Sequence, residues 1–281
     1  MAAILLNGND LARRLKLKMK QEVDAMKANG ILPGLAVVIV GNNPASRSYV
    51  TMKERDCGEV GIRSFEYALP EETAEVDLLG LIDQLNADPN VHGILIQLPV
   101  PAHISEARVL ERINPDKDAD AFHPQSAGRI LIGNQTFLPC TPAGVMEMLK
   151  DAGIEVAGKD CVVVGRSNIV GKPMALLLLQ ANGTVTVCHS KTKNLKEVCA
   201  RADILVAAIG RAKMIDASYV KEGAVVIDVG INRDENGKMV GDVDFDSVVG
   251  KASFLTPVPG GVGPMTRAML LANTLKAAGL V

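Results

Sequence analysis

Apolar and polar positions along the first hundred residues follow two alternating periods, which predict helices and strands in turn. Residues 9–30 have apolar side chains at helical spacing and end at a glycine, as helices often do. Residues 34–41 (GLAVVIVG) form an unbroken apolar run, typical of a strand that is buried on both faces. Helices over 43–61 and 73–87 and strands over 62–69 and 91–98 follow, and the apolar start MAAILL predicts a first strand. This order predicts parallel strands joined by helices.

A second alternating series occupies the rest of the chain. It predicts a helix over 141–153, a hairpin turn at 234–238, a final helix over 265–280, and strands over 160–165, 184–189, 202–210, 224–230 and 253–257. Residues 99–144, between the two series, are richer in Pro, Asp and Gly, so we place the crossing between domains there. The two series predict an α/β protein of two domains with a cleft between them.

The composition argues against several classes of partner. Thirty basic and 32 acidic side chains leave a net charge of −2, and aromatic residues make up only 3% with no Trp, so we expect no nucleic acid partner. The five cysteines form no C-x-x-C pair, which favours buried free thiols. The four histidines do not have the spacing of metal ligands, so we expect no bound metal ion. No signal peptide and no run of about 18 apolar residues is present, so we expect a cytoplasmic protein without a membrane span.

The turn GRSNIVGKP (165–173) lies between a predicted strand and helix, where dinucleotide-binding folds hold a phosphate. It departs from the G-x-G-x-x-G pattern, because Ser167 and Val170 replace the second and third glycines. Gly165 can still form the bend, and Arg166 offers a planar cation suited to phosphate. An ordinary strand-to-helix turn explains the same residues, so the turn alone does not decide between the two.

The end of the next predicted strand indicates which nucleotide fits. In NAD-selective folds an acidic residue near this position binds the ribose 2′-hydroxyl. Here the strand ends in Ser190, Lys191 and Lys193 with no carboxylate, which favours the 2′-phosphate of NADP. Surface lysines are also common beside loops, and that reading stays open.

Three polar side chains in the first half suggest a reaction site. Tyr49 and Lys53 lie four residues apart, on one face of a predicted helix, and Gln97 ends a predicted parallel strand, where ligand sites of α/β folds form. Lys53 can act as a base near neutral pH only if its pKa falls by about three units, on the order of 4 kcal/mol. A packed ring beside a lysine that extends to solvent is the plainer alternative.

Two loops carry further candidates. Asp116, Asp118 and Asp120 alternate as in a calcium loop, but Ala121 and Ala127 stand where that loop needs Gly and Glu. The aspartates therefore indicate either a solvated loop or a carboxylate that binds the N–H edge of a heterocycle. The loop PVPGGVGPMT (257–266) combines rigidity with close backbone approach, either to a ligand or to another chain segment.

Seven motifs occur in order over nearly the whole chain, namely SYVTMK, GILIQLPVP, INPDKDADAF, PCTPAG, GRSNIVGKP, VVIDVGIN and PVPGGVGPMT. Together they resemble the bifunctional methylenetetrahydrofolate dehydrogenase/methenyltetrahydrofolate cyclohydrolase family. The resemblance implies a folate-binding N-terminal α/β domain of three layers (1–139), onto which the final helix (264–281) packs back. It also implies a Rossmann-like NADP-binding domain with a parallel sheet (140–263), and assembly as a homodimer.

The activity implied by the resemblance is NADP-dependent oxidation of 5,10-methylenetetrahydrofolate, followed by hydrolysis of the methenyl product to 10-formyltetrahydrofolate, without a metal. By motif position, the implied catalytic residues are Lys53, Gln97 and Tyr49, with Lys53 as the lysine of the hydrolysis. The implied substrate-binding residues are Tyr49, Lys53, Gln97, Leu98, Pro99, Asp120, Pro259, Gly260 and Gly261. The implied cofactor-binding residues are Thr141, Gly165, Arg166, Ser167, Ile169, Ser190 and Ile231.

One position departs from the family pattern: Ala121 replaces the glycine that usually follows the aspartate of the folate site. If the backbone there has positive φ, alanine strains the turn and affects Asp120; if φ is negative, alanine is harmless.

Other functions remain open from the residues alone. A two-domain NADP dehydrogenase for a shikimate-type alcohol and a nucleotide-sensing module without turnover both explain the second half, but give Tyr49, Lys53 and Gln97 no joint purpose. A dehydrogenase without the hydrolytic step is also open, because hydrolysis depends on the placement of Lys53.

Overall fold

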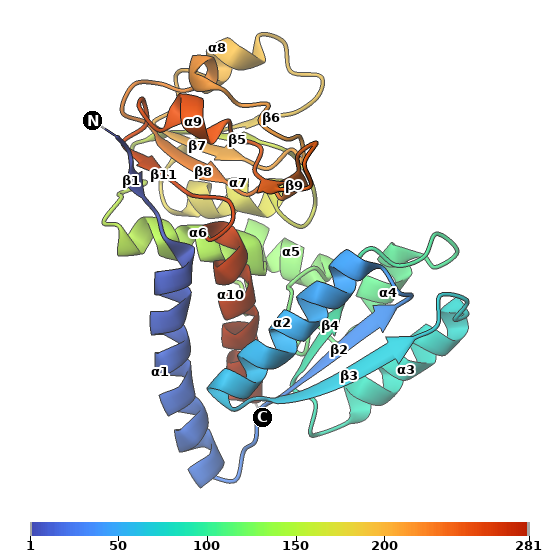
Figure 1. Ribbon diagram of the computed structural model, residues 1–281. Helices are drawn as coiled ribbons and strands as arrows, with labels where there is room; N and C mark the ends of the chain where they lie inside the picture. Colours follow the sequence, from blue (N-terminus) through green and yellow to red (C-terminus); the bar gives the residue numbers. More distant parts are fainter. Residues whose placement is uncertain (1, 280–281) are drawn as a thin grey trace. The chain divides into compact units, whose positions relative to one another are not determined.

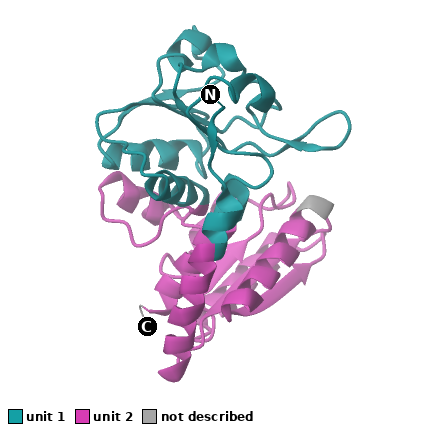
Figure 2. Cartoon of the chain, turned by 60° about the vertical axis from the view of Figure 1, so that its left-hand side comes forward, with its two compact units in different colours: residues 1–13, 141–266 teal, residues 14–140, 267–281 magenta. Residues whose placement is uncertain are grey.

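A computed structural model describes residues 2–279 and divides the chain into two compact units. Unit 1 contains the residues up to Arg13 together with Thr141–Thr266, and unit 2 contains Arg14–Cys140 together with the residues from Arg267 on (Figure 2). No helix in the described part of the chain is long and apolar enough to cross a membrane.

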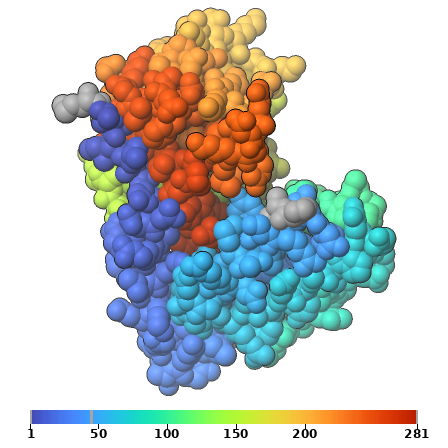
Figure 3. Space-filling view, in the orientation of Figure 1, coloured from blue at the N-terminus to red at the C-terminus, as the bar shows by residue number. Residues whose placement is uncertain are grey.

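Unit 2 is built on a three-stranded parallel sheet in the order β3 (Arg63–Leu69), β2 (Gly34–Val40), β4 (Gly93–Ile96). Every residue of β2 is buried, as its apolar run predicts. Alternate side chains of β2 enter two cores: Leu35, Val37 and Ile39 pack with α1 (Gly8–Ala28), α2 (Pro44–Val60) and α10 (Val262–Ala278). Their neighbours in β2 pack with α3 (Glu75–Ala87) and α4 (Glu106–Arg112), which completes three layers (Figure 1). The outer side chains of α1, blue in Figure 3, form part of the surface of this unit.

Several helices of unit 2 begin where a polar side chain accepts a backbone N–H group. The Asn43 side chain accepts the N–H of Ser46 at the start of α2. Ser105 does the same for α4, and His123 caps α5 (Pro124–Leu131), which has proline in its first turn. We did not predict α4 and α5, because both are short and lie in the segment that its Pro, Asp and Gly content marked as a domain crossing.

Unit 1 is built on a six-stranded parallel sheet in the order β1 (Ile4–Leu5), β11 (Phe254–Leu255), β8 (Val225–Asp228), β7 (Ile204–Ala207), β5 (Asp160–Val164), β6 (Thr184–Cys188). The helix α7 (Gly171–Gln180) covers one face, while α8 (Leu195–Cys199) and α9 (Phe245–Val248) cover the other (Figure 1). The helix α6 (Cys140–Asp151) precedes β5 in the chain, and a 3-10 turn spans Ala217–Tyr219. The strands β9 (Asn232–Arg233) and β10 (Met239–Val240) pair as the predicted hairpin.

The structure differs from the predicted domain bounds at the beginning of the chain. We predicted residues 1–139 as one domain, but β1 pairs in parallel with β11, so the residues up to Arg13 belong to unit 1. An apolar pattern predicts a strand but not the strand with which it pairs, and the partner of β1 lies about 250 residues away in the sequence. The division between the units consequently falls inside two helices, α1 and α10.

Candidate active site

The side chains of Lys53 and Gln97 are hydrogen-bonded in unit 2. Lys53 lies on α2, and Gln97 directly follows β4 at the carboxyl end of that strand. The Nζ atom of Lys53 lies 3.0 Å from Oε1 of Gln97, while Nε2 of Gln97 donates to the Leu98 carbonyl at 2.9 Å. The second bond orients the amide so that its oxygen faces the lysine. The two residues that the sequence singled out from separate elements therefore form one pair.

Asp120 reaches the same region because its segment runs alongside β4. The N–H of Ile94 donates to the Lys117 carbonyl at 2.7 Å, and the N–H of Ala119 donates to the Ile94 carbonyl at 3.3 Å. The half-buried Asp120 side chain follows this short pairing and is hydrogen-bonded to the thiol of Cys140.

Burial shifts the titration of this group of residues toward neutral forms. Desolvation lowers the pKa of Lys53, with the charge of Asp120 opposing the shift and the charge of Arg267 adding to it. Desolvation also raises the pKa of Asp120 to about 6, and here the charge of Lys53 opposes. The direction for Lys53 is the one that a base acting near neutral pH requires.

The remaining substrate candidates are divided between the units. Tyr49 lies half-buried on α2, one turn before Lys53. Gln97 is followed by Leu98 and the exposed Pro99, which are joined by a cis peptide bond. In contrast, Pro259, Gly260 and Gly261 lie in unit 1, between β11 and α10.

The loop that holds these glycines makes a tight contact within unit 1. The N–H of Asn9 donates to the Gly260 carbonyl at 3.2 Å, and a Cβ atom on Gly8 would lie 1.8 Å from the Gly261 carbonyl oxygen. Close approach to another chain segment, one of the two readings left open, therefore accounts for part of the glycine content.

Several residues that support the site were not predicted. Asp56, on α2, is buried and paired with Nζ of Lys16 at 2.9 Å and with Nε of Arg267 at 2.6 Å. Asn273, on α10, donates to the carbonyls of Ala119 and Leu138 at 2.8 and 2.9 Å. The contacts of Asp56 with Arg267 and of Asn273 with both carbonyls join segments more than 130 residues apart, and no local pattern marks such partners.

The turn at Ala121 has positive φ (58°), so the strained alternative considered for this position holds. The turn is fixed by Asp118, whose Oδ2 accepts the N–H of His123 at 2.8 Å and the hydroxyl of Ser126 at 3.2 Å. The Ala121 methyl group packs in a small buried cluster with Phe137 and Ala277, and this contact offsets part of the strain.

Substitution of Ala121 should test that balance. We expect Ala121→Val to lower the free energy of unfolding by about 2–4 kcal/mol, because a β-branched residue is strained at positive φ and overpacks the buried cluster. In Ala121→Gly, relief of strain is opposed by the lost methyl contact and by greater freedom of the unfolded chain, so a change within about 1 kcal/mol is expected. Urea denaturation of both variants measures the difference, and equal stabilities would contradict it.

Most of the cofactor candidates lie at or near the carboxyl ends of strands in unit 1. Gly165, after β5, has φ of 134°, and a Cβ atom there would lie 2.1 Å from the Ala208 carbonyl oxygen, so only glycine fits this turn. The Ser167 hydroxyl accepts the N–H groups of Val170 and Gly171 at 3.1 and 3.2 Å and thereby caps α7. Arg166 is exposed beside it. A glycine bend at a capped helix N-terminus suits a phosphate group.

The other cofactor candidates take different positions in the same unit. Ser190 is exposed shortly after β6, and Ile231, 48% exposed, follows β8. Because the strands are parallel, their carboxyl ends meet at one edge of the sheet, where nucleotides bind in such folds. Ile169 is half-buried in the turn before α7, and the Thr141 hydroxyl lies 3.0 Å from that of Thr266 near the start of α6.

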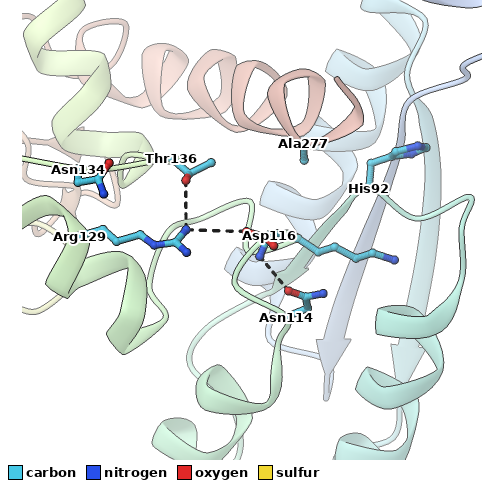
Figure 4. Close-up of a pocket in the computed structure, with 8 residues that line it drawn as sticks. His92, Asn114, Asp116, Arg129, Asn134, Thr136 and Ala277 are labelled. Carbon is cyan, nitrogen blue, oxygen red and sulfur yellow. Dashed lines mark hydrogen bonds and ion pairs between the residues drawn. The ribbon is translucent and has the colours of Figure 1, made fainter. Parts of the chain in front are cut away.

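A cavity of about 590 Å³ in unit 2 lies away from these residues (Figure 4). It is lined by His92, Asn114, Asp116, Lys117, Arg129, Asn134, Thr136 and Ala277. His92 precedes β4 whereas Gln97 follows it, so the cavity adjoins the opposite end of the strand. Arg129 donates to the hydroxyl of Thr136 at 3.1 Å and pairs with Asp116 at 3.8 Å (Figure 4). The ion pair partly neutralises the positive charge of Arg129 in the cavity wall.

No group of three or more His, Cys, Asp or Glu side chains suited to a metal ion occurs among residues 2–279. The five cysteines are buried and free.

Two family models match the chain. The catalytic domain of tetrahydrofolate dehydrogenase/cyclohydrolase matches residues 6–120, and the NAD(P)-binding domain of the same family matches residues 139–280. The chain belongs to this family. The resemblance carried by the seven motifs is thereby confirmed, as is an α/β fold of two domains with parallel sheets.

Relatives of known name cover the whole chain. The bifunctional protein FolD of Acetivibrio thermocellus is 61% identical over 280 residues, which is 100% of this chain and 98% of the relative. The crystal structure of FolD from Campylobacter jejuni, a methylenetetrahydrofolate dehydrogenase/cyclohydrolase, has a TM-score of 0.98 with 51% identity and 99% coverage of both chains. The Trypanosoma brucei enzyme, complexed with NADP and an inhibitor, has a TM-score of 0.96 with 37% identity, covering 100% of this chain and 98% of its own.

Proposed function

We propose that this enzyme oxidises 5,10-methylenetetrahydrofolate to the 5,10-methenyl cation with NADP⁺ and then hydrolyses the cation to 10-formyltetrahydrofolate. The observation that carries the proposal is the hydrogen bond between Lys53 and Gln97, in a chain whose entire length matches the dehydrogenase/cyclohydrolase family. The bifunctional relatives give the reaction class, and this pair gives the hydrolytic step its chemical basis.

The first reaction needs alignment more than activation. The reacting carbon lies between two nitrogen atoms, whose lone pairs stabilise the cation left by hydride loss, so no Lewis acid is needed. When bound, the cofactor supplies the hydride acceptor. The task of the protein is to orient the folate, for which we propose Tyr49 against the aminobenzoyl ring and Asp120 on the pterin, with Leu98, Pro99, Pro259, Gly260 and Gly261 as further contacts.

The second reaction needs a proton acceptor. Water adds to the methenyl carbon and loses one proton. The bond from this carbon to N5 then breaks, the remaining hydroxyl proton passes to N5, and the formyl group stays on N10. We propose that Lys53 in its neutral form takes or relays this proton, because burial lowers its pKa and Gln97 fixes the amine. A charged ammonium would be unfavourable beside a cationic substrate, so the lowered pKa serves both binding and proton transfer.

The cofactor candidates fit NADP. We propose that Gly165 and Ser167 shape the turn for the phosphates, that Arg166 and Ser190 bind the 2′-phosphate, and that Ile231 packs on the cofactor, with Thr141 and Ile169 nearby. The exposure of Arg166 and Ser190 supports this assignment, because both side chains are accessible to a ligand.

The location and assembly of the enzyme remain predictions. We propose a cytoplasmic enzyme, which the five free cysteines support, since reducing compartments keep thiols unpaired. The homodimer implied by the family resemblance is tested by light scattering, where the mass of a single chain would contradict it.

The function is tested by incubating the purified enzyme with methylenetetrahydrofolate and NADP⁺. We expect the absorbance of the methenyl species to rise with NADPH and then to fall as 10-formyltetrahydrofolate forms. Binding of NADP⁺ without product would support a nucleotide-sensing module instead. Methenyl accumulation without enzymatic decay would leave only the dehydrogenase, and activity on a shikimate-type alcohol alone would favour the rival dehydrogenase.

A further inference from the structure

Two buried aspartates of unit 1 have no place in the functions described above. Asp228 ends β8, and Asp242 follows the β9–β10 hairpin. Their exposed fractions are 3% and 0%. Carboxylates at such depth are retained only when donors satisfy them, so the identity of the donors shows what each one holds.

Asp242 accepts four hydrogen bonds from two different segments. Its Oδ2 atom accepts the backbone N–H groups of Ile209 and Gly210 at 2.6 and 3.0 Å. Its Oδ1 atom accepts the N–H of Arg211 at 2.7 Å and the side-chain Nδ2 of Asn232 at 2.9 Å. One side chain thus fixes both the loop after β7 and the segment after β8.

Asp228 in turn holds the segment that carries Asp242. Its Oδ1 atom accepts the N–H groups of Gly230 and Asp242 at 3.0 and 2.9 Å, and Oδ2 accepts the N–H of Val243 at 2.9 Å. Burial, with the nearby charge of Asp242, raises the pKa of Asp228 to about 7 against these donors.

Glycines opposite the two carboxylates permit this close packing. A Cβ atom on Gly230 would lie 2.3 Å from Cγ of Asp242, and one on Gly241 would lie 1.7 Å from Oδ2 of Asp228. A side chain at either position would displace the aspartate that it faces. Glycine at both positions is therefore required for the two carboxylates to keep their places.

The segments held in this way contain Ile231 and adjoin the turn at Gly165, two of the cofactor candidates. Ile231 lies between Gly230 and Asn232, which bond to the two different aspartates. The loop fixed by Asp242 follows Ala208, whose carbonyl fills the space beside Gly165 in the phosphate turn. The two aspartates therefore link the segments at the carboxyl ends of β5, β7 and β8, at the edge of the sheet where nucleotides bind in such folds.

We propose that Asp242, supported by Asp228, is a positioning residue for the nicotinamide cofactor, because it sets the loop after β7 and the backbone around Ile231. The inference rests on the proposed function. It predicts that loss of the Asp242 carboxylate weakens cofactor binding selectively, because the four donors that this carboxylate accepts lie in unit 1, whereas Lys53, Gln97 and Asp120 belong to unit 2.

The experiment compares Asp242→Asn with the wild-type enzyme. The amide cannot accept all four donors, since its NH₂ group must face at least one N–H. We expect the KM for NADP⁺ to rise at least tenfold, the kcat at saturating NADP⁺ to stay within about threefold, and hydrolysis of supplied methenyltetrahydrofolate to remain at the wild-type rate.

Two further variants keep the test decisive. Asn232→Ala removes a single donor and leaves the carboxylate in place, so it should raise the KM for NADP⁺ about threefold. This variant tests the inference even if Asp242→Asn fails to fold. Asp203→Asn is the matched control, because Asp203 accepts the N–H of Asp160 at 2.9 Å and pairs with Lys221 at the opposite ends of the strands. It should leave the KM for NADP⁺ unchanged.

An unchanged KM for NADP⁺ in both Asp242→Asn and Asn232→Ala would overturn the inference, as would an equal rise in Asp203→Asn. An equal loss of hydrolysis in Asp242→Asn would also overturn it, by indicating a general structural role. A wild-type enzyme without dehydrogenase activity would instead refute the proposed function, so the two failures are distinguishable.

Discussion

Lys53→Met should hydrolyse methenyltetrahydrofolate no faster than buffer alone does. The rate of hydrolysis should fall at least about a hundredfold, as expected when a general base is removed. Methionine keeps much of the length of the lysine stem and tolerates a half-buried site, so the fold should persist. The measurement is the decay of the methenyl absorbance after addition of enzyme, with the uncatalysed decay subtracted. When the reaction starts from methylenetetrahydrofolate, the methenyl species should accumulate.

The matched control is Lys20→Met, on the exposed side of α1, where the ammonium pairs with Asp24 at 3.4 Å in an exposed contact. It should hydrolyse the substrate at the wild-type rate. A companion variant, Gln97→Leu, removes the acceptor that fixes Lys53 and should reduce hydrolysis less than loss of the amine itself. Normal hydrolysis by Lys53→Met would refute the assignment of the lysine as the base.

The parts of the site that local patterns can encode were predictable. Tyr49 and Lys53 share a helix face through their spacing, and Gln97 ends an apolar strand, so the elements that carry all three could be predicted from the sequence. Gly165 likewise marks a bend between a strand and a helix. The parallel sheets followed from alternating elements, because crossover helices require them.

The parts that depend on distant partners were not predictable. The pairing of β1 with β11, the bonds from Asn273 to the segment before Asp120, and the contact between Asp56 and Arg267 all join remote residues. Spacing carries no information about such contacts. The positive φ at Ala121 was likewise undecided from sequence, because the turn is fixed by the buried Asp118 and not by the residue itself.

The preference for NADP over NAD should be lost in Arg166→Ala combined with Ser190→Ala. Each charge-assisted hydrogen bond to a phosphate contributes about 1.5–3 kcal/mol, so the KM for NADP⁺ should rise about a hundredfold or more. The KM for NAD⁺ should change by no more than about threefold, because NAD lacks the 2′-phosphate. Initial rates of methenyl formation at varied cofactor concentration measure both constants.

The dependence on salt separates a phosphate contact from a general loss of folding. Arg166 is exposed, so its attraction to a dianion is screened, and the difference between wild type and double variant should shrink as ionic strength rises. Arg201→Ala, which removes an exposed arginine beside the opposite ends of β5 and β6, serves as the control and should leave both constants unchanged. Equal increases in the KM for NADP⁺ and NAD⁺ would show that these side chains do not recognise the 2′-phosphate, and the selectivity would then have to arise from other residues at this edge.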